Sequence, residues 1–250
     1  MILITGCAGT LGKEFIRQLK DEDVIGIDNN EWAMAELQKE FPEVKLILDD
    51  FAEWKFDQDP CDTVIHTAAY KHVNLGEENP NSFIDNNIIK TRKFFAEAYK
   101  NGADIVFIST DKAVEPCSLY GFSKAIGESL ARFYGGKVVR LGNLLNSSGS
   151  VIPVWEKCIA ENKPLPVTDP QMTRYVIEVE DAVKQILENL NNHCDLFIPD
   201  MGQPIKLQGL VKNVLQKHNK MTSSYPIEII GMRPGEKKHE KLRWEHEETI

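Results

Sequence analysis

Short apolar runs alternate with longer amphipathic segments along most of this 250-residue chain. Short apolar runs bounded by turn residues are typical of buried strands, and we place them at residues 2–5, 24–27, 45–48, 63–66, 105–109, 137–140, 196–199 and 227–230. Between them, helical spacing predicts helices near residues 11–20, 31–40, 80–100, 119–133, 180–190 and 206–217. Asn79 or Asn81 is a suitable N-cap for the helix near 80–100, and Gly102 follows its end. The alternation predicts an α/β fold with a doubly wound parallel sheet.

Three glycines follow the first apolar run. Gly6, Gly9 and Gly12 form the pattern G-x-x-G-x-x-G between the first predicted strand and the first predicted helix. Glycine allows a backbone approach that a Cβ would block, and a helix N-terminus offers free N–H groups to a phosphate. Asp28 ends the second predicted strand, near the position from which a carboxylate holds a ribose diol. The pattern predicts a dinucleotide-binding turn.

The alternating pattern loosens after Arg140. Residues 141–175 and 199–250 are richer in Pro, Ser, Asn and isolated charges. We therefore expect a nucleotide-binding domain of residues 1–140 and 176–198, with a smaller lobe of residues 141–175 and 199–250 folded over it. Ligands then bind outside the carboxyl ends of the strands.

A tyrosine and a lysine lie four residues apart in the predicted helix near 119–133. Tyr120 and Lys124 therefore share one helix face. An ammonium near a phenol stabilises the phenolate and lowers its pKa, and such a phenol can take a proton from an alcohol. The pair follows a predicted strand that ends in Ser109 and continues into Thr110. Together with the glycine turn, this favours catalysis over a solvated tyrosine beside a surface lysine.

Composition narrows the function classes. The formal net charge is −9, which makes nucleic acid an unsuitable partner by bulk electrostatics. The five cysteines are scattered without a C-x-x-C pair, which argues against a disulfide framework or a zinc site, and we expect no metal. We see no apolar run long enough for a membrane span and no signal-peptide pattern at the start. We therefore expect a cytoplasmic protein.

Seven segments carry a resemblance to a known family. They are residues 66–73 (HTAAYKHV), 109–113 (STDKA), 119–124 (LYGFSK), 142–143 (GN), 149–153 (GSVIP), 172–175 (MTRY) and 233–237 (RPGEK). In this order they resemble the extended short-chain dehydrogenase/reductase family, across nearly the whole chain. Within that family the chain is most similar to the C5-inverting UDP-N-acetylglucosamine 4,6-dehydratases of polysaccharide biosynthesis. The resemblance implies a Rossmann-type sheet with a C-terminal substrate-binding lobe.

The resemblance also implies a redox-neutral loss of water from the sugar. Tyr120 takes the 4-OH proton as hydride leaves C4 for the nicotinamide, and Thr110 hydrogen-bonds that oxygen. The new 4-ketone acidifies the C5 proton, Lys112 removes it, Asp111 protonates the departing 6-OH, and hydride returns to C6. Retaining sugar dehydratases carry a glutamate at the lysine position, so Lys112 points to the inverting group. A lysine base needs a depressed pKa, which burial or nearby cations supply; the plainer reading of the pair is an N-cap and a surface lysine.

Three sets of site residues follow. Expected catalytic residues are Thr110, Asp111, Lys112, Tyr120 and Lys124. Expected cofactor-binding residues are Gly6, Ala8, Gly9, Thr10, Leu11, Gly12, Asp28, Asp50, Phe51, Ala68, Ala69, Lys71, Tyr120 and Lys124. Expected substrate-binding residues are His72, Asn87, Asn143, Arg174, Arg233 and Glu236, the two arginines because guanidinium forks match diphosphate oxygens. Plainer alternatives stay open: a solvated turn at Asp50, a structural His72 and a polar helix position at Asn87.

The sequence departs from the family pattern in three ways. It is several dozen residues shorter than family members usually are. Ser148 stands where the family usually has a basic residue. Asp28 stands where the closest dehydratases carry small or basic residues suited to a 2′-phosphate, and a carboxylate repels that phosphate while accepting hydrogen bonds from a diol. We therefore expect NAD rather than NADP, with a UDP-sugar as substrate and a homo-oligomeric enzyme.

Other functions remain open from the sequence. A UDP-sugar 4-epimerase uses the same tyrosine and cofactor but needs no acid–base pair for elimination, so Asp111 and Lys112 favour the dehydratase. A net nucleotide-sugar reductase would release oxidised cofactor at each turnover. A non-catalytic cofactor sensor would not need Tyr120 and Lys124, and both are present.

Overall fold

The structure, a computed structural model, describes residues 1–145, 147, 150–192, 194–245 and 247. Ser148, one of the departures from the family pattern, lies outside the described residues. In the part of the chain that the structure describes, each helix is too short or too polar to cross a bilayer.

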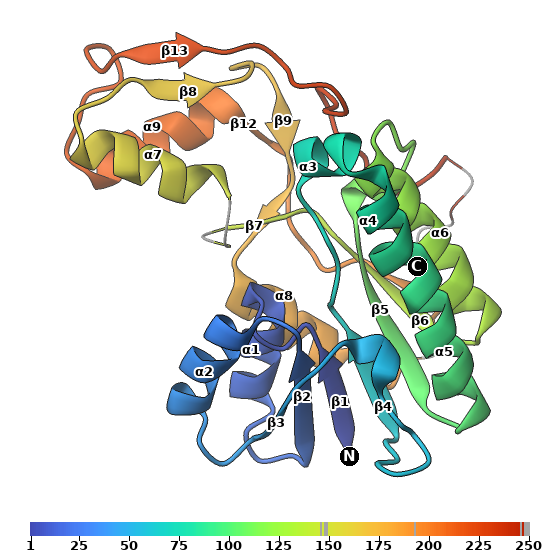
Figure 1. Cartoon of the computed structure of the whole chain (residues 1–250). Coiled ribbons are helices and arrows are strands. Elements are labelled where there is room, and N and C mark those ends of the chain that lie inside the picture. The colour runs from blue at the N-terminus through green and yellow to red at the C-terminus, as the bar shows by residue number, and fades with distance from the viewer. Residues whose placement is uncertain (146, 148–149, 193, 246, 248–250) are drawn as a thin grey trace.

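A parallel sheet forms the centre of the larger part of the molecule (Figure 1). Its strands are β1 (Ile2–Thr5), β2 (Val24–Asp28), β3 (Lys45–Leu48), β4 (Thr63–His66), β5 (Asp104–Thr110), β6 (Lys137–Leu141) and β11 (Leu196–Phe197). Their order is β11-β6-β5-β4-β1-β2-β3, and all neighbours are parallel. This confirms the predicted doubly wound sheet. The order reverses between β1 and β4, and such sheets bind ligands beyond the carboxyl ends of the strands at this point.

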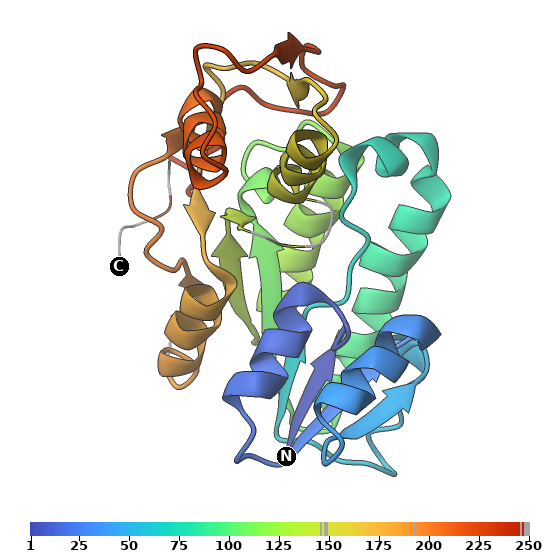
Figure 2. The same cartoon turned by 90° about the vertical axis from the view of Figure 1, so that its left-hand side faces the viewer.

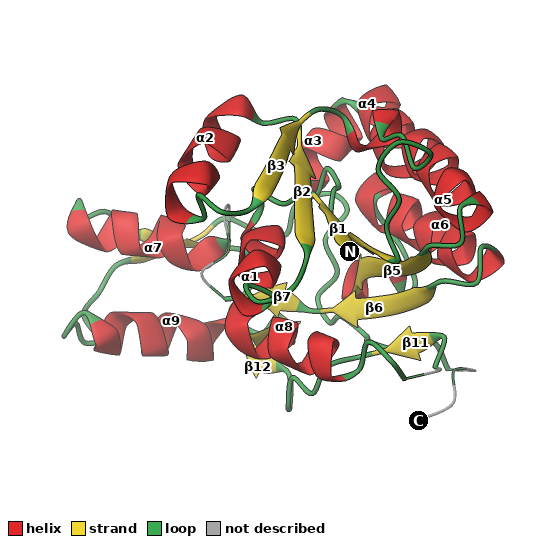
Figure 3. Ribbon diagram, turned by 90° about the horizontal axis from the view of Figure 1, so that it is seen from below, coloured by secondary structure: helices red, strands yellow, loops and turns green. Residues whose placement is uncertain are grey.

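Helices cover both faces of the sheet (Figure 3). One face carries α1 (Thr10–Gln18), α2 (Glu31–Glu40) and α8 (Val179–Glu188), whose apolar residues Phe15, Leu37 and Val183 share one core. The other face carries α5 (Thr91–Lys100) and α6 (Leu119–Phe133), where Phe94 and Phe95 pack against the sheet. Both cores are buried because the helices present apolar stripes to strands that are apolar on both faces.

The helix expected near residues 80–100 is divided. It consists of α4 (Pro80–Ile84), a π-helical segment η2 (Asp85–Lys90) and α5, and α3 (Val73–Glu78) precedes it. Asn79 is the N-cap residue of α4 but makes no capping hydrogen bond with its side chain. Gly102 follows the end of α5 with a φ of +76°, a conformation that favours glycine. The sequence pattern missed α3 and the π-helical segment.

A second lobe lies beyond the carboxyl ends of the strands (Figure 1). Its elements are α7 (Val151–Ala160), β8 (Leu165–Val167), β9 (Thr173–Arg174), β12 (Ile205–Lys206), α9 (Leu207–Lys217) and β13 (Ile227–Ile229). Its own core includes Trp155, Leu165, Leu210 and Leu215. The strand pair β7 (Asn143–Leu144) and β10 (Val176–Ile177) leads toward it. The sequence missed α7 and β8; the α7 segment begins Val151-Ile152-Pro153, and β-branched residues and proline are weak helix signals.

The C-terminal segment, residues 238–245 and 247, runs from this lobe back to the sheet (Figure 2). At its start, the backbone of Thr173 in β9 donates to the Lys238 carbonyl at 3.0 Å. Toward its end, the Arg140 guanidinium of β6 donates to the Leu242 carbonyl at 2.7 Å and to the Glu247 carboxylate at 2.7 Å. We propose that the chain divides, as predicted, into a nucleotide-binding domain and a smaller lobe. The C-terminal segment makes contacts with both.

Candidate active site

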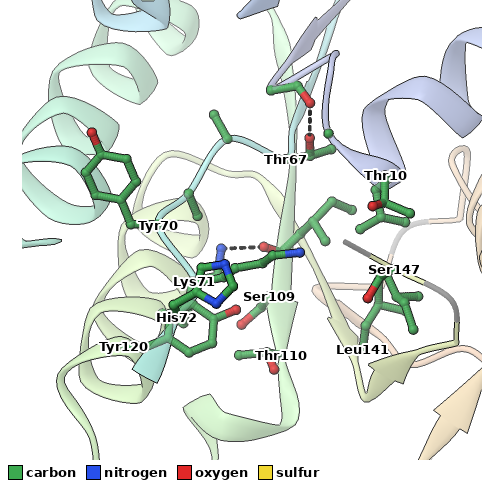
Figure 4. Close-up of a pocket in the computed structure, with 18 of the residues that line it drawn as sticks. Thr10, Thr67, Tyr70, Lys71, His72, Ser109, Thr110, Tyr120, Leu141 and Ser147 are labelled. Atoms are coloured by element: carbon green, nitrogen blue, oxygen red, sulfur yellow. Dashed lines mark hydrogen bonds between the residues drawn. The ribbon is translucent and has the colours of Figure 1, made fainter. Parts of the chain in front are cut away.

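A cavity of about 460 Å³ opens at the carboxyl ends of the strands, and Figure 4 shows side chains that line it. Most of the predicted site residues line it: Gly6, Gly9, Thr10, Leu11, Asp28, Phe51, Ala68, Ala69, Lys71, His72, Thr110, Lys112, Tyr120, Lys124 and Asn143. Thr67, Tyr70, Ser109, Ser147 and Ser150 also line it, although the sequence did not single them out. The ring of Tyr70 points away from the other labelled side chains (Figure 4).

The glycine turn forms a backbone cradle at one end of this cavity. Gly6 has a φ of +67°, and a Cβ there would lie 2.7 Å from the Ala68 nitrogen. A Cβ on Gly12 would lie 2.4 Å from the Gly6 carbonyl oxygen. Gly12 therefore does not line the cavity but lets the first turn of α1 approach the loop. This cradle at a helix N-terminus fits the pyrophosphate of a dinucleotide.

Asp28 closes the same end of the cavity from β2. Its two carboxylate oxygens accept hydrogen bonds from the backbone amides of Ala8, at 3.2 Å, and Asn30, at 2.9 Å. Ala8 is not part of this cavity's lining as far as the structure describes it, and its amide instead supports Asp28. The two amides hold the carboxylate at the cavity, where its remaining lone pairs can accept from a diol.

Asp50 and Phe51 have different roles. Phe51 lines the cavity, but among the described residues Asp50 does not. Its carboxylate caps the short helix η1 (Phe51–Glu53) through the Ala52 amide at 3.0 Å and pairs with Lys90 at 2.7 Å. Burial alone would raise the pKa of Asp50, but the Lys90 ammonium and the Ala52 amide outweigh it and lower the pKa. The contacts of Asp50 are therefore structural, neither a solvated turn nor a contact to the cavity.

Tyr120 and Lys124 reach the cavity from the first turns of α6. The helix starts at the N-cap Ser118, whose hydroxyl accepts from the Gly121 amide at 3.1 Å. The Tyr120 hydroxyl makes a hydrogen bond with the Thr110 side chain, and both residues line the cavity (Figure 4). The Lys124 ammonium donates to the Ile108 carbonyl at 2.6 Å and lies 4.0 Å from the centre of the Phe107 ring.

Burial governs the pKa of both groups. It lowers the pKa of Lys124 to about 7, against a smaller raising effect of the Glu128 carboxylate. It raises the pKa of Tyr120, although Lys112 and the hydrogen bond with Thr110 oppose it. The expectation of a lowered tyrosine pKa is therefore wrong for this structure, because removal of the phenolate from water outweighs the nearby cation.

Asp111 and Lys112 form a contact pair in the turn η3 (Asp111–Ala113), directly after β5. The Lys112 ammonium donates to Oδ1 of Asp111 at 2.9 Å, and the Thr110 hydroxyl donates to the same oxygen at 2.9 Å. Asp111 is fully buried, and its Oδ2 has no hydrogen-bond partner among the described residues. Asp111 itself is absent from the cavity lining that the structure describes, although its neighbours Thr110 and Lys112 are part of it. Lys112 also lies 3.5 Å from the Asn143 side-chain oxygen of β7.

The expected depression of the Lys112 pKa is wrong. Burial by itself lowers the pKa of Lys112, but the carboxylates of Asp111 and Glu240 outweigh burial and raise it. Burial alone would have given the expected direction. The second carboxylate beside this lysine, Glu240, comes from a segment far away along the chain, so no local pattern signals it.

Asn87 holds the backbone of a loop that borders the cavity. Its side-chain oxygen accepts from the Tyr70 amide at 2.9 Å, and its nitrogen donates to the Tyr70 carbonyl at 2.8 Å and to Ser123 at 3.1 Å. Among the described residues it is not part of the cavity lining. Asn87 therefore anchors the loop that carries Lys71 and His72, which do line the cavity.

Three predicted substrate-binding residues lie in or near the second lobe, away from the cavity lining that the structure describes. The buried Arg174 guanidinium donates to the carbonyls of Thr173, at 2.7 Å, and Lys238, at 3.3 Å. Arg233 is exposed, and its backbone amide donates to the Glu236 carboxylate at 3.0 Å. Arg174 is therefore bound within the lobe, whereas the Arg233 side chain faces solvent.

The sequence analysis missed two buried acidic residues. Glu240, which looked like part of a polar tail, is 6% exposed and lies against Lys112 and Lys237. Glu128, one helical turn after Lys124, accepts from Ser109 at 2.5 Å and from Arg140 at 2.6 Å. The four-residue spacing from Lys124 was the signal for Glu128. Nothing local marked Glu240, because its contacts come from distant segments.

This sheet order, with a Tyr-x-x-x-Lys helix packed beside β5 and a glycine cradle after β1, is that of a Rossmann-type dinucleotide-binding fold. More particularly, the chain belongs to the family described as polysaccharide biosynthesis protein, which matches it over residues 2–250.

Three curated relatives illustrate the range of the family. The probable polysaccharide biosynthesis protein EpsC of Bacillus subtilis is 35% identical over 267 residues, which cover 96% of this chain and 44% of EpsC. The chain thus spans less than half of that relative. A Campylobacter jejuni protein named UDP-N-acetylglucosamine 4,6-dehydratase (inverting) is 33% identical, with 96% of this chain and 76% of the relative covered. A Rickettsia canadensis protein named UDP-glucose 4-epimerase is 29% identical, with the same two coverages of 96% and 76%.

Solved structures share the fold. Pen from Bacillus thuringiensis superposes with a TM-score of 0.86 at 29% identity, covering 96% of this chain and 81% of Pen. DesIV of Streptomyces venezuelae, a dTDP-glucose 4,6-dehydratase with NAD bound, gives a TM-score of 0.84 at 21% identity, covering 97% of this chain and 88% of DesIV. At 21% identity, the likeness to DesIV shows only that the two proteins share a fold.

Proposed function

We propose that this protein is a nucleotide-sugar 4,6-dehydratase that acts on UDP-N-acetylglucosamine and inverts C5, using NAD. One observation carries the proposal: Lys112, which lines the same cavity as Tyr120 and Lys124, forms a contact pair with the buried Asp111. The 33% identity to a relative with that name supports the substrate, and the name of DesIV supports NAD.

The chain's own residues divide the proton transfers among them. The bound nicotinamide would supply a hydride acceptor for C4 and a hydride donor for C6. Tyr120 accepts the 4-OH proton, and Thr110 hydrogen-bonds the same sugar oxygen. Lys112 accepts the C5 proton in its neutral form, and Asp111 gives a proton to the 6-OH so that water leaves. The Oδ2 of Asp111, which has no hydrogen-bond partner among the described residues, supports the role of this residue as the acid.

Binding is shared between the two parts of the molecule. We infer that the glycine cradle holds the pyrophosphate, Asp28 the ribose diol, and Lys71 and Lys124 the nicotinamide half. His72 and Asn143 line the cavity and are the leading sugar contacts. Arg174 and Arg233 remain proposed diphosphate contacts, of which the exposed Arg233 is the better placed to reach a ligand, and Glu236 remains a proposed substrate contact. A homo-oligomer in the cytoplasm stays part of the proposal.

A UDP-sugar 4-epimerase is the second candidate. The carboxylates that raise the pKa of Lys112 favour it, because an epimerase needs no neutral lysine. The epimerase names among the relatives support the same candidate.

Mass spectrometry and NMR distinguish these reactions. We expect the purified protein, incubated with UDP-N-acetylglucosamine without added cofactor, to form a product lighter by one water. In deuterated water the product should carry deuterium at C5 with inverted configuration. A product of unchanged mass with inverted C4 would establish the epimerase, and net oxidation of supplied reduced cofactor would establish a reductase.

Two variants separate the steps. Tyr120→Phe should lose about 10²–10⁴-fold in rate and show no absorbance of reduced nicotinamide on mixing with substrate. Lys112→Met should lose dehydration to a similar extent yet accumulate that absorbance, because C5–H becomes acidic only once C4 is a ketone. Full dehydration by Lys112→Met would remove Lys112 from the mechanism.

A further inference from the structure

Glu240 brings a buried negative charge from the C-terminal segment to the proposed base. Its side chain is 2% exposed, and one carboxylate oxygen lies 3.9 Å from the Lys112 ammonium. The other lies 2.8 Å from the ammonium of Lys237. Lys237 is itself held by a hydrogen bond to the Val114 carbonyl at 2.6 Å, just after the turn that carries Lys112. The contact is therefore part of a packed arrangement and not a loose surface pair.

Lys112 is faced by charged or titratable groups from several elements. Asp111 contributes its carboxylate from η3 at 2.9 Å, Tyr120 its phenol from α6, and Glu240 its carboxylate from the C-terminal segment. Asn143 of β7 contributes a neutral oxygen at 3.5 Å. The Cys117 thiol is a further titratable group nearby, and Lys237, Glu240, Glu77 and Lys112 all act on it electrostatically. Apart from Lys237, these groups around Lys112 are neutral or acidic.

A lysine between two carboxylates keeps its proton to a higher pH than a lysine beside one. Asp111 is adjacent in sequence and is assigned the acid role. Glu240 comes from the C-terminal segment. It can therefore be substituted while Asp111, the proposed acid, is left unchanged. Because the Lys112 side chain is 24% exposed, its protonation state can also be probed directly by a reagent in solution.

We propose that Glu240 is a positioning residue for Lys112: it holds the ammonium toward Asp111 and sets the pH above which Lys112 can accept a proton. The catalytic meaning of this role rests on the proposed function. The contact itself does not, and the experiment treats the two separately.

Competitive labelling tests the contact without substrate. The whole protein is acetylated with trace acetic anhydride over a pH series, and acetylation of the peptide that contains Lys112 is followed by mass spectrometry. In Glu240→Gln, which keeps the shape but removes the charge, we expect the apparent pKa of Lys112 to fall by about one unit or more. Glu240→Asp keeps the charge and should restore most of the difference, which also guards against a variant that folds poorly. Glu245→Gln is the matched control, because this carboxylate is 92% exposed and pairs only with Lys241 among the described residues.

The pH profile of dehydration provides the second measurement. The rise of kcat with pH should move to lower pH by the same amount in Glu240→Gln, whereas a merely structural role would lower kcat at every pH without moving the rise. An unchanged labelling pKa in Glu240→Gln overturns the inference, even if the wild type dehydrates the sugar. A lowered labelling pKa in a protein whose wild type forms no dehydrated sugar upholds the contact and rejects the proposed function.

Discussion

The sheet region and the second lobe present their predicted site residues differently. In the sheet region, the glycine turn, Asp28, Thr110 and Tyr120 all lie at the carboxyl end of a strand or in the first turn of a helix, and all reach one cavity. In the second lobe, Arg174 is bound to carbonyls of its own lobe, and Arg233 faces solvent. Figure 2 shows the lobe beyond the strand ends, built from short elements.

The difference has a geometric origin. Strands β5 and β6 pair over five successive residues, so the position of Thr110 follows from the register of the sheet. Strands β9 and β12 pair over only two residues. Parallel strand ends converge on one edge whatever their sequence, whereas the direction of a side chain on a short strand depends on the packing around it.

The largest expected effect is a loss of stability in the sheet region. Glu128→Ala removes one of the two carboxylate partners of the buried Arg140, whose Nε and Nη2 donate to Glu128 at 3.0 and 2.6 Å, and it removes the partner of the Ser109 hydroxyl. Glu247 still pairs with Arg140, but two charge-assisted hydrogen bonds of about 1.5–3 kcal/mol each are lost, so the free energy of unfolding in urea should fall by about 3–5 kcal/mol.

Glu36→Ala is the control for this change. Its carboxylate pairs with Lys39 on the exposed side of α2, and its removal should cost about 0.5 kcal/mol or less. Equal losses in the two variants would show that the buried pair does not hold β5, β6 and α6 together.

A smaller effect tests the second lobe. Arg174→Met removes hydrogen bonds to the Thr173 and Lys238 carbonyls and should cost about 1.5–3 kcal/mol of unfolding free energy. Arg233→Ala changes an exposed side chain and should alter stability by less than about 0.5 kcal/mol. If Arg233 binds the diphosphate, Arg233→Ala should also raise KM, because the substrate then loses a contact worth about 1.5–3 kcal/mol. If Arg174→Met leaves the free energy of unfolding unchanged but raises KM, Arg174 binds the substrate and its role is not structural.

The smallest expected effect concerns the choice between NAD and NADP at the proposed cofactor site of the sheet region. Asp28→Ser should relax the preference for NAD over NADP by about 1–3 kcal/mol, since the carboxylate no longer repels a 2′-phosphate. Calorimetric titration of both dinucleotides measures the preference, with the exposed Asp21→Ser as the control. Tighter binding of NADP than NAD by the wild type would refute the assignment.

Much of the sheet could be predicted because its signals are local. The apolar runs at residues 2–5, 45–48 and 63–66 coincide with β1, β3 and β4. The predicted helices at 31–40 and 119–133 coincide with α2 and α6. The missed elements carry mixed signals: α7 contains Pro153 in its first turn, and η2 changes from α- to π-helical hydrogen bonding within a continuous helical pattern.

The sequence by itself determined the class of fold, the glycine cradle, the Tyr120–Lys124 pair and the adjacency of Asp111 to Lys112, because each depends on spacing within one or two neighbouring elements. Only the tertiary structure decided the charges around them. It brought Glu240 from the far end of the chain to Lys112, turned Arg174 toward carbonyls, and joined Asp50 to Lys90. Electrostatic effects act through space, and the partners that raise or lower a pKa are chosen by packing between segments that no local pattern connects.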